Sequence, residues 1–157
     1  MFSENIVVAF AFGSPAHITP NILIAERALV VSDWGKKFRI FSQYDVPLQK
    51  YSGIHFLDSG SSHISTLDLI QRLYKELTII TRTPSNTITV KLVAAPPHKS
   101  RVIRDLLNMG FDVEDASRIW YTKYPPSIWY DRSSTQLRTR HPLFWWTREL
   151  FLRALPW

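Results

Sequence analysis

The sequence predicts a single α/β domain in which a doubly wound, mostly parallel sheet carries helices on both faces. Its 157 residues suit one domain. Short apolar runs alternate with segments of helical character, an order that is typical of parallel sheets. The first of these runs, residues 6–12, is apolar throughout, which favours a strand buried on both faces.

Each element is predicted from its own residue pattern and from the signal that stops it. In chain order, the predicted elements are strand 6–12, helix 22–34, strand 37–42, strand 53–58, helix 64–77, strand 87–95, helix 100–109, a strand that starts at 111–113, an extended piece at 117–122 and helix 143–155. Helix 64–77 has a clear apolar stripe with a period of 3.6 residues. Strand 87–95 is rich in β-branched residues and is ended by Pro96, and Gly110 ends the following helix.

Composition and charge narrow the classes of protein that the chain can belong to. The absence of Cys excludes disulfides, thiolate metal sites and a Cys nucleophile, and no His has a metal-type spacing to another ligand. A net charge of +6 and a pI of about 9.8 suggest an anionic partner, with solubility as the plain alternative. No apolar run is long enough for a transmembrane segment and residues 1–5 lack the layout of a signal peptide, so we expect a cytoplasmic protein.

Ligands of parallel sheets bind at the carboxyl ends of the strands, which directs attention to the loops 13–21, 42–47, 58–63 and 96–101. The last loop contains His98 and Arg101 and leads from a buried strand into a helix. A helix N-terminus offers free N–H groups, and a guanidinium can hold a phosphate or carboxylate with two hydrogen bonds. We therefore expect Arg101 to bind an anion, against the alternative of a solvated basic loop.

Other candidate ligand-binding residues precede or lie within predicted helices. Ser61, Ser62 and Thr66 could donate hydrogen bonds to a ligand, although capping of the helix is the favoured alternative for this stretch. Gly13 would let a ligand approach the backbone closely. Arg27 could reach the crevice, and a surface ion pair is its plain alternative.

Motifs that would define a reaction are missing from the sequence. The chain has no dinucleotide-binding glycine pattern, no Walker-type loop and no G-x-S-x-G elbow. His98 is the one candidate for a catalytic proton carrier, because an unperturbed imidazole titrates near neutral pH. Whether the protein is an enzyme is left open.

The aromatic tail, residues 141–157, permits three interpretations. It packs on the sheet as the last helix, which we favour, or it forms an interface between copies of the chain, or it lies on a membrane surface as a peripheral contact. Glu149 lies within this apolar helix and requires a cationic partner, for which Arg148, Arg27 and Arg101 are the candidates.

These residues together resemble the SanA/YdcF/ElyC family, a bacterial family with a Rossmann-like domain of poorly defined function. The resemblance rests on the strand and turn at 7–13, on Arg27, on Ser65, Thr66 and Asp68, on the strand 90–95 followed by His98, Arg101 and Gly110, and on Glu149. It implies a small-molecule or nucleotide-like ligand in the crevice, with S-adenosylmethionine as a candidate cofactor. It also favours Arg27, Thr66, His98 and Arg101 as site residues.

The leading functional hypothesis is therefore a Rossmann-like protein that binds an anionic small molecule or nucleotide-type ligand at the strand carboxyl ends. Its rival is a non-enzymatic interaction protein that uses the aromatic C-terminal helix on a protein partner or membrane surface. Nucleic-acid binding is a weaker third hypothesis, because it rests only on the positive charge and on Trp and Tyr residues near Arg in 120–140.

Overall fold

The computed structural model describes residues 4–60, 64–80, 82 and 84–154, and it confirms the predicted α/β class. Its strands are β1 (Glu4–Phe10), β2 (Arg39–Ser42), β3 (Ile54–Phe56), β4 (Ile88–Ala94) and β5 (Asp112–Asp115). Its α-helices are α1 (Thr19–Val31), α2 (Thr66–Tyr74), α3 (Pro96–Asn108) and α4 (Pro142–Ala154). The five strands form one sheet in the order β3-β2-β1-β4-β5, and every neighbouring pair is parallel. The architecture is a Rossmann-like α/β fold.

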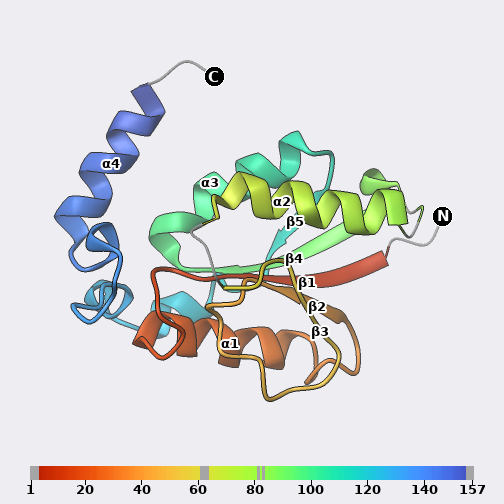
Figure 1. Ribbon diagram of the computed structural model, residues 1–157, viewed down its shortest axis with the longest axis horizontal. Coiled ribbons are helices and arrows are strands. Elements are labelled where there is room, and N and C mark those ends of the chain that lie inside the picture. The colour runs from red at the N-terminus through yellow and green to blue at the C-terminus, as the bar shows by residue number, and fades with distance from the viewer. Residues whose placement is uncertain (1–3, 61–63, 81, 83, 155–157) are drawn as a thin grey trace.

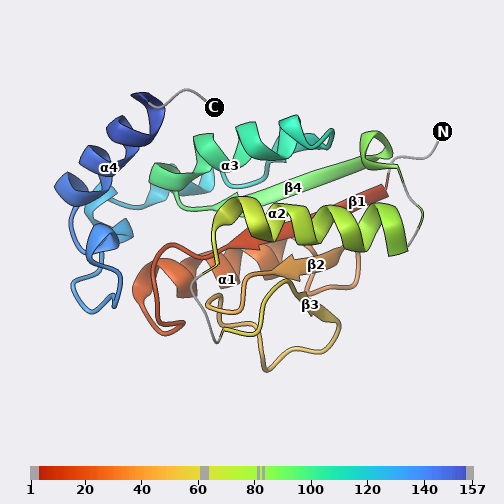
Figure 2. The same ribbon diagram turned by 45° about the horizontal axis from the view of Figure 1, so that its top comes forward.

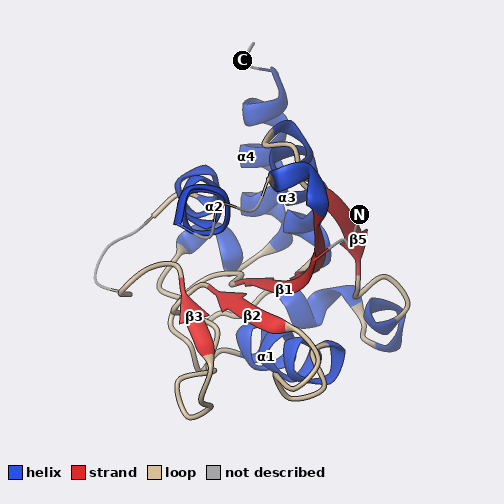
Figure 3. Ribbon diagram, turned by 90° about the vertical axis from the view of Figure 1, so that its right-hand side faces the viewer, coloured by secondary structure: helices blue, strands red, loops and turns tan. Residues whose placement is uncertain are grey.

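Helices cover both faces of the sheet, with α1 on one face and α2 and α3 on the other (Figures 1, 2 and 3). The side chains of β1 alternate between the two cores. Val7 packs with the α1 core, whereas Val8 packs with residues of α2 and α3. This double burial explains why the first apolar run shows no alternation with polar residues.

The direction in which the strands are added reverses between β1 and β4. The chain first builds β2 and β3 outward on one side of β1, then returns through α2 to place β4 on the other side. The connections that leave β1 and β4 therefore diverge to opposite faces. This divergence opens a crevice at the carboxyl ends of the two strands, which is the usual ligand position in such sheets.

The helix α3 begins earlier than the sequence predicted. It starts at Pro96, four residues before the expected residue 100, so the expected loop 96–101 is helical. Proline ended the strand, as predicted, but it also suits the first positions of a helix, where no N–H is needed for the helical hydrogen bonds. His98 and Arg101 consequently lie on the first two turns of a rigid element.

The predicted extended piece at 117–122 is wrong. After β5 the chain turns, because Ser117 N donates to Asp115 Oδ1 at 3.2 Å and Tyr121 N donates to Ser117 O at 3.0 Å. A 3-10 helix, Trp120–Lys123, follows. The segment after it contains two further short 3-10 helices, Pro126–Trp129 and Leu137–Thr139.

The last helix, α4, does not pack on the sheet as we had favoured. It extends from the carboxyl-end side of the molecule, beyond the strands (Figure 1). Trp145 and Glu149 are buried, but five large apolar residues are exposed: Leu143, Phe144, Trp146, Leu150 and Phe151. No helix within the described residues is long and apolar enough to cross a membrane.

Candidate functional site

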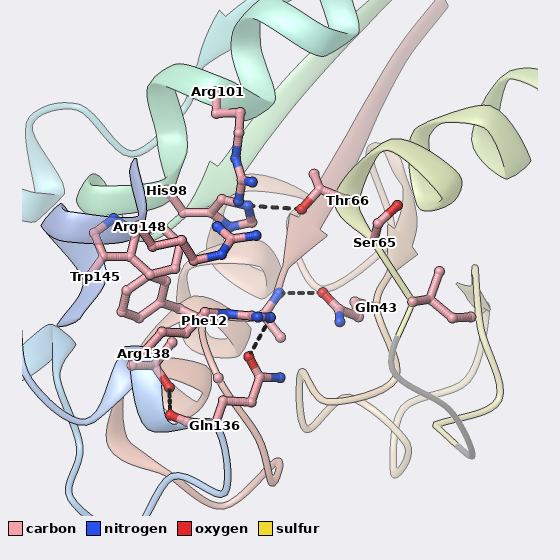
Figure 4. Close-up of a pocket in the computed structure, with 14 residues that line it drawn as sticks. Phe12, Gln43, Ser65, Thr66, His98, Arg101, Gln136, Arg138, Trp145 and Arg148 are labelled. Atoms are coloured by element: carbon pink, nitrogen blue, oxygen red, sulfur yellow. Dashed lines mark hydrogen bonds between the residues drawn. The ribbon is translucent and has the colours of Figure 1, made fainter. Parts of the chain in front are cut away.

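A small pocket of about 100 Å³ lies at the carboxyl ends of β1 and β4, where the strand order reverses (Figure 4). Five segments contribute to its wall: the turn after β1, the residue after β2, the start of α2, the start of α3, and the segment 136–148. The lining residues are Ala11, Phe12, Gly13, Gln43, Ile64, Ser65, Thr66, His98, Arg101, Gln136, Arg138, Thr139, Trp145 and Arg148.

Three arginines from three different elements meet at this pocket. Arg101 comes from α3, Arg138 from the 3-10 helix Leu137–Thr139, and Arg148 from α4 (Figure 4). Burial lowers the pKa of Arg138, and repulsion from Arg148 and Arg101 lowers it further. The guanidinium groups are therefore close enough to destabilise one another's positive charge.

Glu149 is the carboxylate that offsets part of this charge. Its Oε1 lies 3.2 Å from Arg148 Nη1 and 3.7 Å from Arg101 Nη2, and its side chain is 3% exposed. Two of the three partners expected from the sequence are therefore its neighbours. Glu149 is not among the residues that line the pocket, so the pocket surface itself presents the guanidinium groups.

His98 is buried between the arginines and a cluster of aromatic rings. Its Nε2 lies 2.9 Å from the hydroxyl oxygen of Thr66, and it contacts the rings of Phe12 and Trp145 edge-on or tilted. Burial lowers the pKa of His98 well below its ordinary value, and repulsion from the three arginines adds to the effect. The imidazole is therefore neutral at pH 7.

Two buried polar atoms at the pocket lack a hydrogen-bond partner among the described residues. They are His98 Nδ1 and Arg101 Nε. Leaving such atoms unpaired is costly, and most buried polar groups in proteins are paired with protein or bound water. These atoms are thus available to a bound molecule.

The turn after β1 is held by the side chain of Asn21, which lies near the start of α1. The buried amide of Asn21 accepts a hydrogen bond from Phe12 N at 2.8 Å and donates to Gly13 O at 3.1 Å. Gly13 itself has φ of +93°, and a Cβ there would lie 2.6 Å from the hydroxyl oxygen of Thr139. The close approach of the chain to Thr139 therefore requires glycine at this position, which also lines the pocket.

The structure brings Gly13, Thr66, His98 and Arg101 together, as the sequence led us to expect, and leaves Arg27 apart. Nε of Arg27 donates to the carbonyl oxygen of Ala116 at 2.9 Å, which ties α1 to the segment after β5. The sequence candidates Ser61 and Ser62 lie outside the described residues.

Two neighbours of the predicted site residues have structural roles. Ser65 caps α2, because its hydroxyl accepts from Asp68 N at 3.1 Å, in agreement with the favoured capping interpretation. Lys99, on the same first turns of α3 as Arg101, pairs with Asp115 at 2.7 Å and does not line the pocket.

Sequence reasoning missed Gln43, Gln136 and Arg138, and it considered Arg148 only as a partner for Glu149. Gln43 positions the first turn, because its Oε1 accepts from Ala11 N at 3.1 Å. Gln136 accepts from Arg138 Nη2 at 3.0 Å and thereby orients that guanidinium. The segment that carries Gln136 and Arg138 has no periodic pattern, so no local signal pointed to them.

The arrangement is better suited to holding an anion than to activating a nucleophile. A hydroxyl nucleophile paired with a histidine base usually needs a third group that orients the imidazole. No described residue hydrogen-bonds to His98 Nδ1. Within the described residues, no cluster of three or more His, Asp or Glu side chains could hold a metal ion.

Comparison of the chain with protein-family models, with curated proteins and with solved structures found no match.

Proposed function

We propose that this protein binds an anionic small molecule, by its negatively charged group, in the pocket at the carboxyl ends of β1 and β4. The observation that carries the proposal is the convergence of Arg101, Arg138 and Arg148 on one small pocket. Guanidinium groups hold phosphate and carboxylate through paired hydrogen bonds. The position is the one at which parallel α/β sheets bind ligands.

The energetics of the pocket support the proposal. Burial lowers the pKa of Arg101, and Arg148 adds to the effect, although Glu149 opposes it. Like charges held together in a partly buried pocket cost free energy, and a bound anion would remove that cost.

S-adenosylmethionine, the cofactor suggested by the resemblance, matches this pocket less well than a ligand whose only charge is negative. It carries a sulfonium cation, and the described lining residues include no carboxylate to receive it. The pocket volume of about 100 Å³ is also below the roughly 300–1,000 Å³ of sites that enclose a drug-sized ligand. The pocket suits the anionic group of a ligand whose remainder lies outside it.

A catalytic role for His98 stays a secondary part of the proposal. A neutral imidazole next to a bound anion could accept a proton from the ligand. The hydroxyl of Thr66, 2.9 Å from Nε2, would then hold the ring in place.

We also propose that the chain is a divergent member of the SanA/YdcF/ElyC family, on the residues given above.

Thermal unfolding at constant ionic strength tests the proposal. Inorganic phosphate, acetate and a nucleotide such as AMP should be compared on the wild type, on Arg101→Gln and on Arg118→Gln. Arg118 is exposed and is not a lining residue, so it is the charge-matched control. At least one anion should raise the melting temperature of the wild type and of Arg118→Gln by about 5 °C near saturation, but not that of Arg101→Gln. Equal shifts in all three proteins, or no shift in any, would contradict the proposal.

The exposed apolar face of α4 favours a second candidate function, an interaction protein. Leu143, Leu150 and Phe151 are each more than 60% exposed, and apolar patches of this kind often mark protein or membrane contacts. Flotation with anionic vesicles would detect a membrane contact, and sedimentation of the free protein would detect a protein contact. Leu150→Ser should abolish whichever association is found, without lowering the melting temperature.

A further inference from the structure

A second pocket, of about 700 Å³, lies between the start of α3, the 3-10 helices Trp120–Lys123 and Pro126–Trp129, and the start of α4. It has no lining residue in common with the first pocket, described above. The two pockets share a wall, because Trp145 Nε1 in the lining of the first donates to the carbonyl oxygen of Pro97, which lines the second, at 3.1 Å. A ligand of the second pocket would therefore occupy a separate site.

The lining of the second pocket contains no charged side chain among the described residues. Apart from prolines and two hydroxyl residues, it consists of the aromatic residues Tyr121, Tyr124, Trp129, Tyr130 and Trp146. The chain has 19 Lys and Arg residues and 13 Asp and Glu residues, and the first pocket is lined by three arginines. The second pocket thus differs from the first in offering an ionic ligand no counter-charge.

The helix ends at the second pocket also lack the groups that bind an anion. The first residues of α3 are Pro96 and Pro97, and the first residue of α4 is Pro142, so none of these three lining residues has a backbone N–H. The next amide of α3, His98 N, already donates to the carbonyl oxygen of Ala95 at 3.0 Å. Helix N-termini bind anions through free N–H groups, so these two ends favour an uncharged ligand.

The hydroxyl groups of the lining leave few places for polar groups of a ligand. The hydroxyl of Tyr121 accepts a backbone N–H at 3.0 Å, and that of Thr122 donates to a backbone carbonyl oxygen at 2.6 Å. The hydroxyls of Tyr124 and Ser127 make no hydrogen bond to a described residue, so they could bind one or two polar atoms of a ligand. A sugar has more hydroxyl groups than this lining could satisfy, whereas an aromatic ring requires few hydrogen bonds.

The aromatic rings of the lining form a fixed base and an accessible rim. Tyr121 and Trp129 are only 7% and 2% exposed, and their rings meet at 90° with centroids 5.2 Å apart. Trp146, from α4, is 45% exposed. Aromatic rings attract one another in edge-to-face and offset-stacked arrangements. An aromatic ligand could therefore contact the buried rings on one side and cover Trp146 on the other.

We propose that the second pocket binds an uncharged small molecule built on an aromatic ring system, in contact with Trp146. The volume of about 700 Å³ lies within the roughly 300–1,000 Å³ of sites that enclose a drug-sized ligand. Such sites are lined mainly by apolar and aromatic side chains with a few polar groups, as this pocket is. The inference does not depend on the proposed binding of an anion, because it concerns other residues.

Fluorescence titration with N-phenyl-1-naphthylamine tests the inference, because this compound is uncharged, aromatic and brighter in apolar surroundings. The wild type should bind it. Trp146→Ala removes a ring of the lining and should weaken binding by at least about fivefold. Phe144→Ala is the matched control, because Phe144 lies on the same helix, is 47% exposed and does not line the pocket. It should change the affinity by less than about twofold.

A second pair of variants tests the preference for an uncharged ligand site. Ser127→Asp introduces a carboxylate into the lining at an exposed residue, and it should weaken binding of the probe by at least about fivefold, because the ligand would desolvate that charge. Ser52→Asp, at an exposed residue outside the pocket, should leave the affinity unchanged. Saturating inorganic phosphate should also leave it unchanged, because the proposed phosphate site is the other pocket.

The possible outcomes each decide the inference. Absence of brightening with the wild type would overturn it, and displacement of the probe by phosphate would do the same by placing the probe in the first pocket. Equal losses of affinity in Trp146→Ala and Phe144→Ala, with Ser127→Asp unaffected, would place the probe on the exposed face of α4 and also overturn it. None of these results alters the test of anion binding, which measures melting temperatures without the probe.

Discussion

The carboxylate of Glu149 accepts a hydrogen bond from the guanidinium of Arg148, its neighbour in the sequence, at 3.2 Å. Both residues lie on α4, which carries them past the end of the sheet to the start of α3. There the same carboxylate comes within 3.7 Å of Arg101. One buried acidic residue thus holds two arginines of different helices at one pocket.

The first prediction concerns the removal of this carboxylate. Glu149→Gln keeps the size of the side chain but leaves the arginines without a counter-charge, so the free energy of unfolding should fall by about 2–4 kcal/mol. Urea denaturation would measure this loss of unfolding free energy. Saturating phosphate should restore more stability to Glu149→Gln than to the wild type, because the anion then replaces a missing charge. Equal stabilisation of the two proteins by phosphate would contradict this view of the pocket.

The second prediction concerns pH. The pKa of His98 is lowered in the folded state, so the unfolded chain takes up a proton below about pH 6.5 that the folded protein does not bind. The contribution of His98 to stability is thus fully present above that pH and is lost as the pH falls, by up to about 1.4 kcal/mol per pH unit. Denaturation of wild type and His98→Gln between about pH 7 and 5 measures the difference. The free energy of unfolding should fall less steeply with decreasing pH in His98→Gln than in the wild type. Parallel plots of this free energy against pH would show that His98 does not carry the effect.

The third prediction uses two glycines with similar backbone angles. Gly13 and Gly53 have φ of +93° and +77°, so alanine strains the backbone at both positions. At Gly53 a Cβ meets no atom within 4 Å, whereas at Gly13 it would lie 2.6 Å from Thr139 and 2.7 Å from Ser134. Gly53→Ala should cost about 1–2 kcal/mol of unfolding free energy and Gly13→Ala about 1–3 kcal/mol more. Gly13→Ala should also weaken anion binding, because it displaces the segment that carries Arg138. Equal losses of unfolding free energy at the two positions would contradict the close approach of Gly13 to Thr139 and Ser134.

The fourth prediction concerns the contact that attaches α4 to the rest of the protein. Trp145 Nε1 donates to the carbonyl oxygen of Pro97 at 3.1 Å, and its ring lies 4.6 Å from that of Phe12. Trp145→Phe loses the hydrogen bond and leaves a void, at a cost of about 1–3 kcal/mol. Trp34→Phe, on an exposed turn, should cost less than about 0.5 kcal/mol. Denaturation followed by far-ultraviolet circular dichroism would compare them, and equal costs would show that Trp145 does not anchor the helix.

Most of the sheet could be predicted from the sequence because burial on both faces leaves a strong local pattern. The apolar run 6–12 and the run 87–95, which is rich in β-branched residues, correspond to β1 at Glu4–Phe10 and β4 at Ile88–Ala94. The beginning of α3 could not be predicted in the same way. Pro96 is compatible with the end of a strand and with the first turn of a helix, so its residue type alone does not distinguish them.

The residues of the candidate site were likewise predictable only where a local sequence pattern leads to them. His98 and Arg101 directly follow a recognisable strand, and the rule for parallel sheets placed them in the crevice. Arg138 is brought there by contacts between distant parts of the chain, such as the hydrogen bond from Thr135 N to Ser14 O at 2.6 Å. A contact across more than a hundred residues leaves no periodic pattern in either segment.

The order of the segments around the pocket also has a consequence for the growing chain. All five strands precede Arg138 and Arg148 in the sequence. Two of the three guanidinium groups of the pocket are therefore synthesised only after every strand of the sheet. A chain that stopped before Arg138 would contain the whole sheet but a single pocket arginine, Arg101.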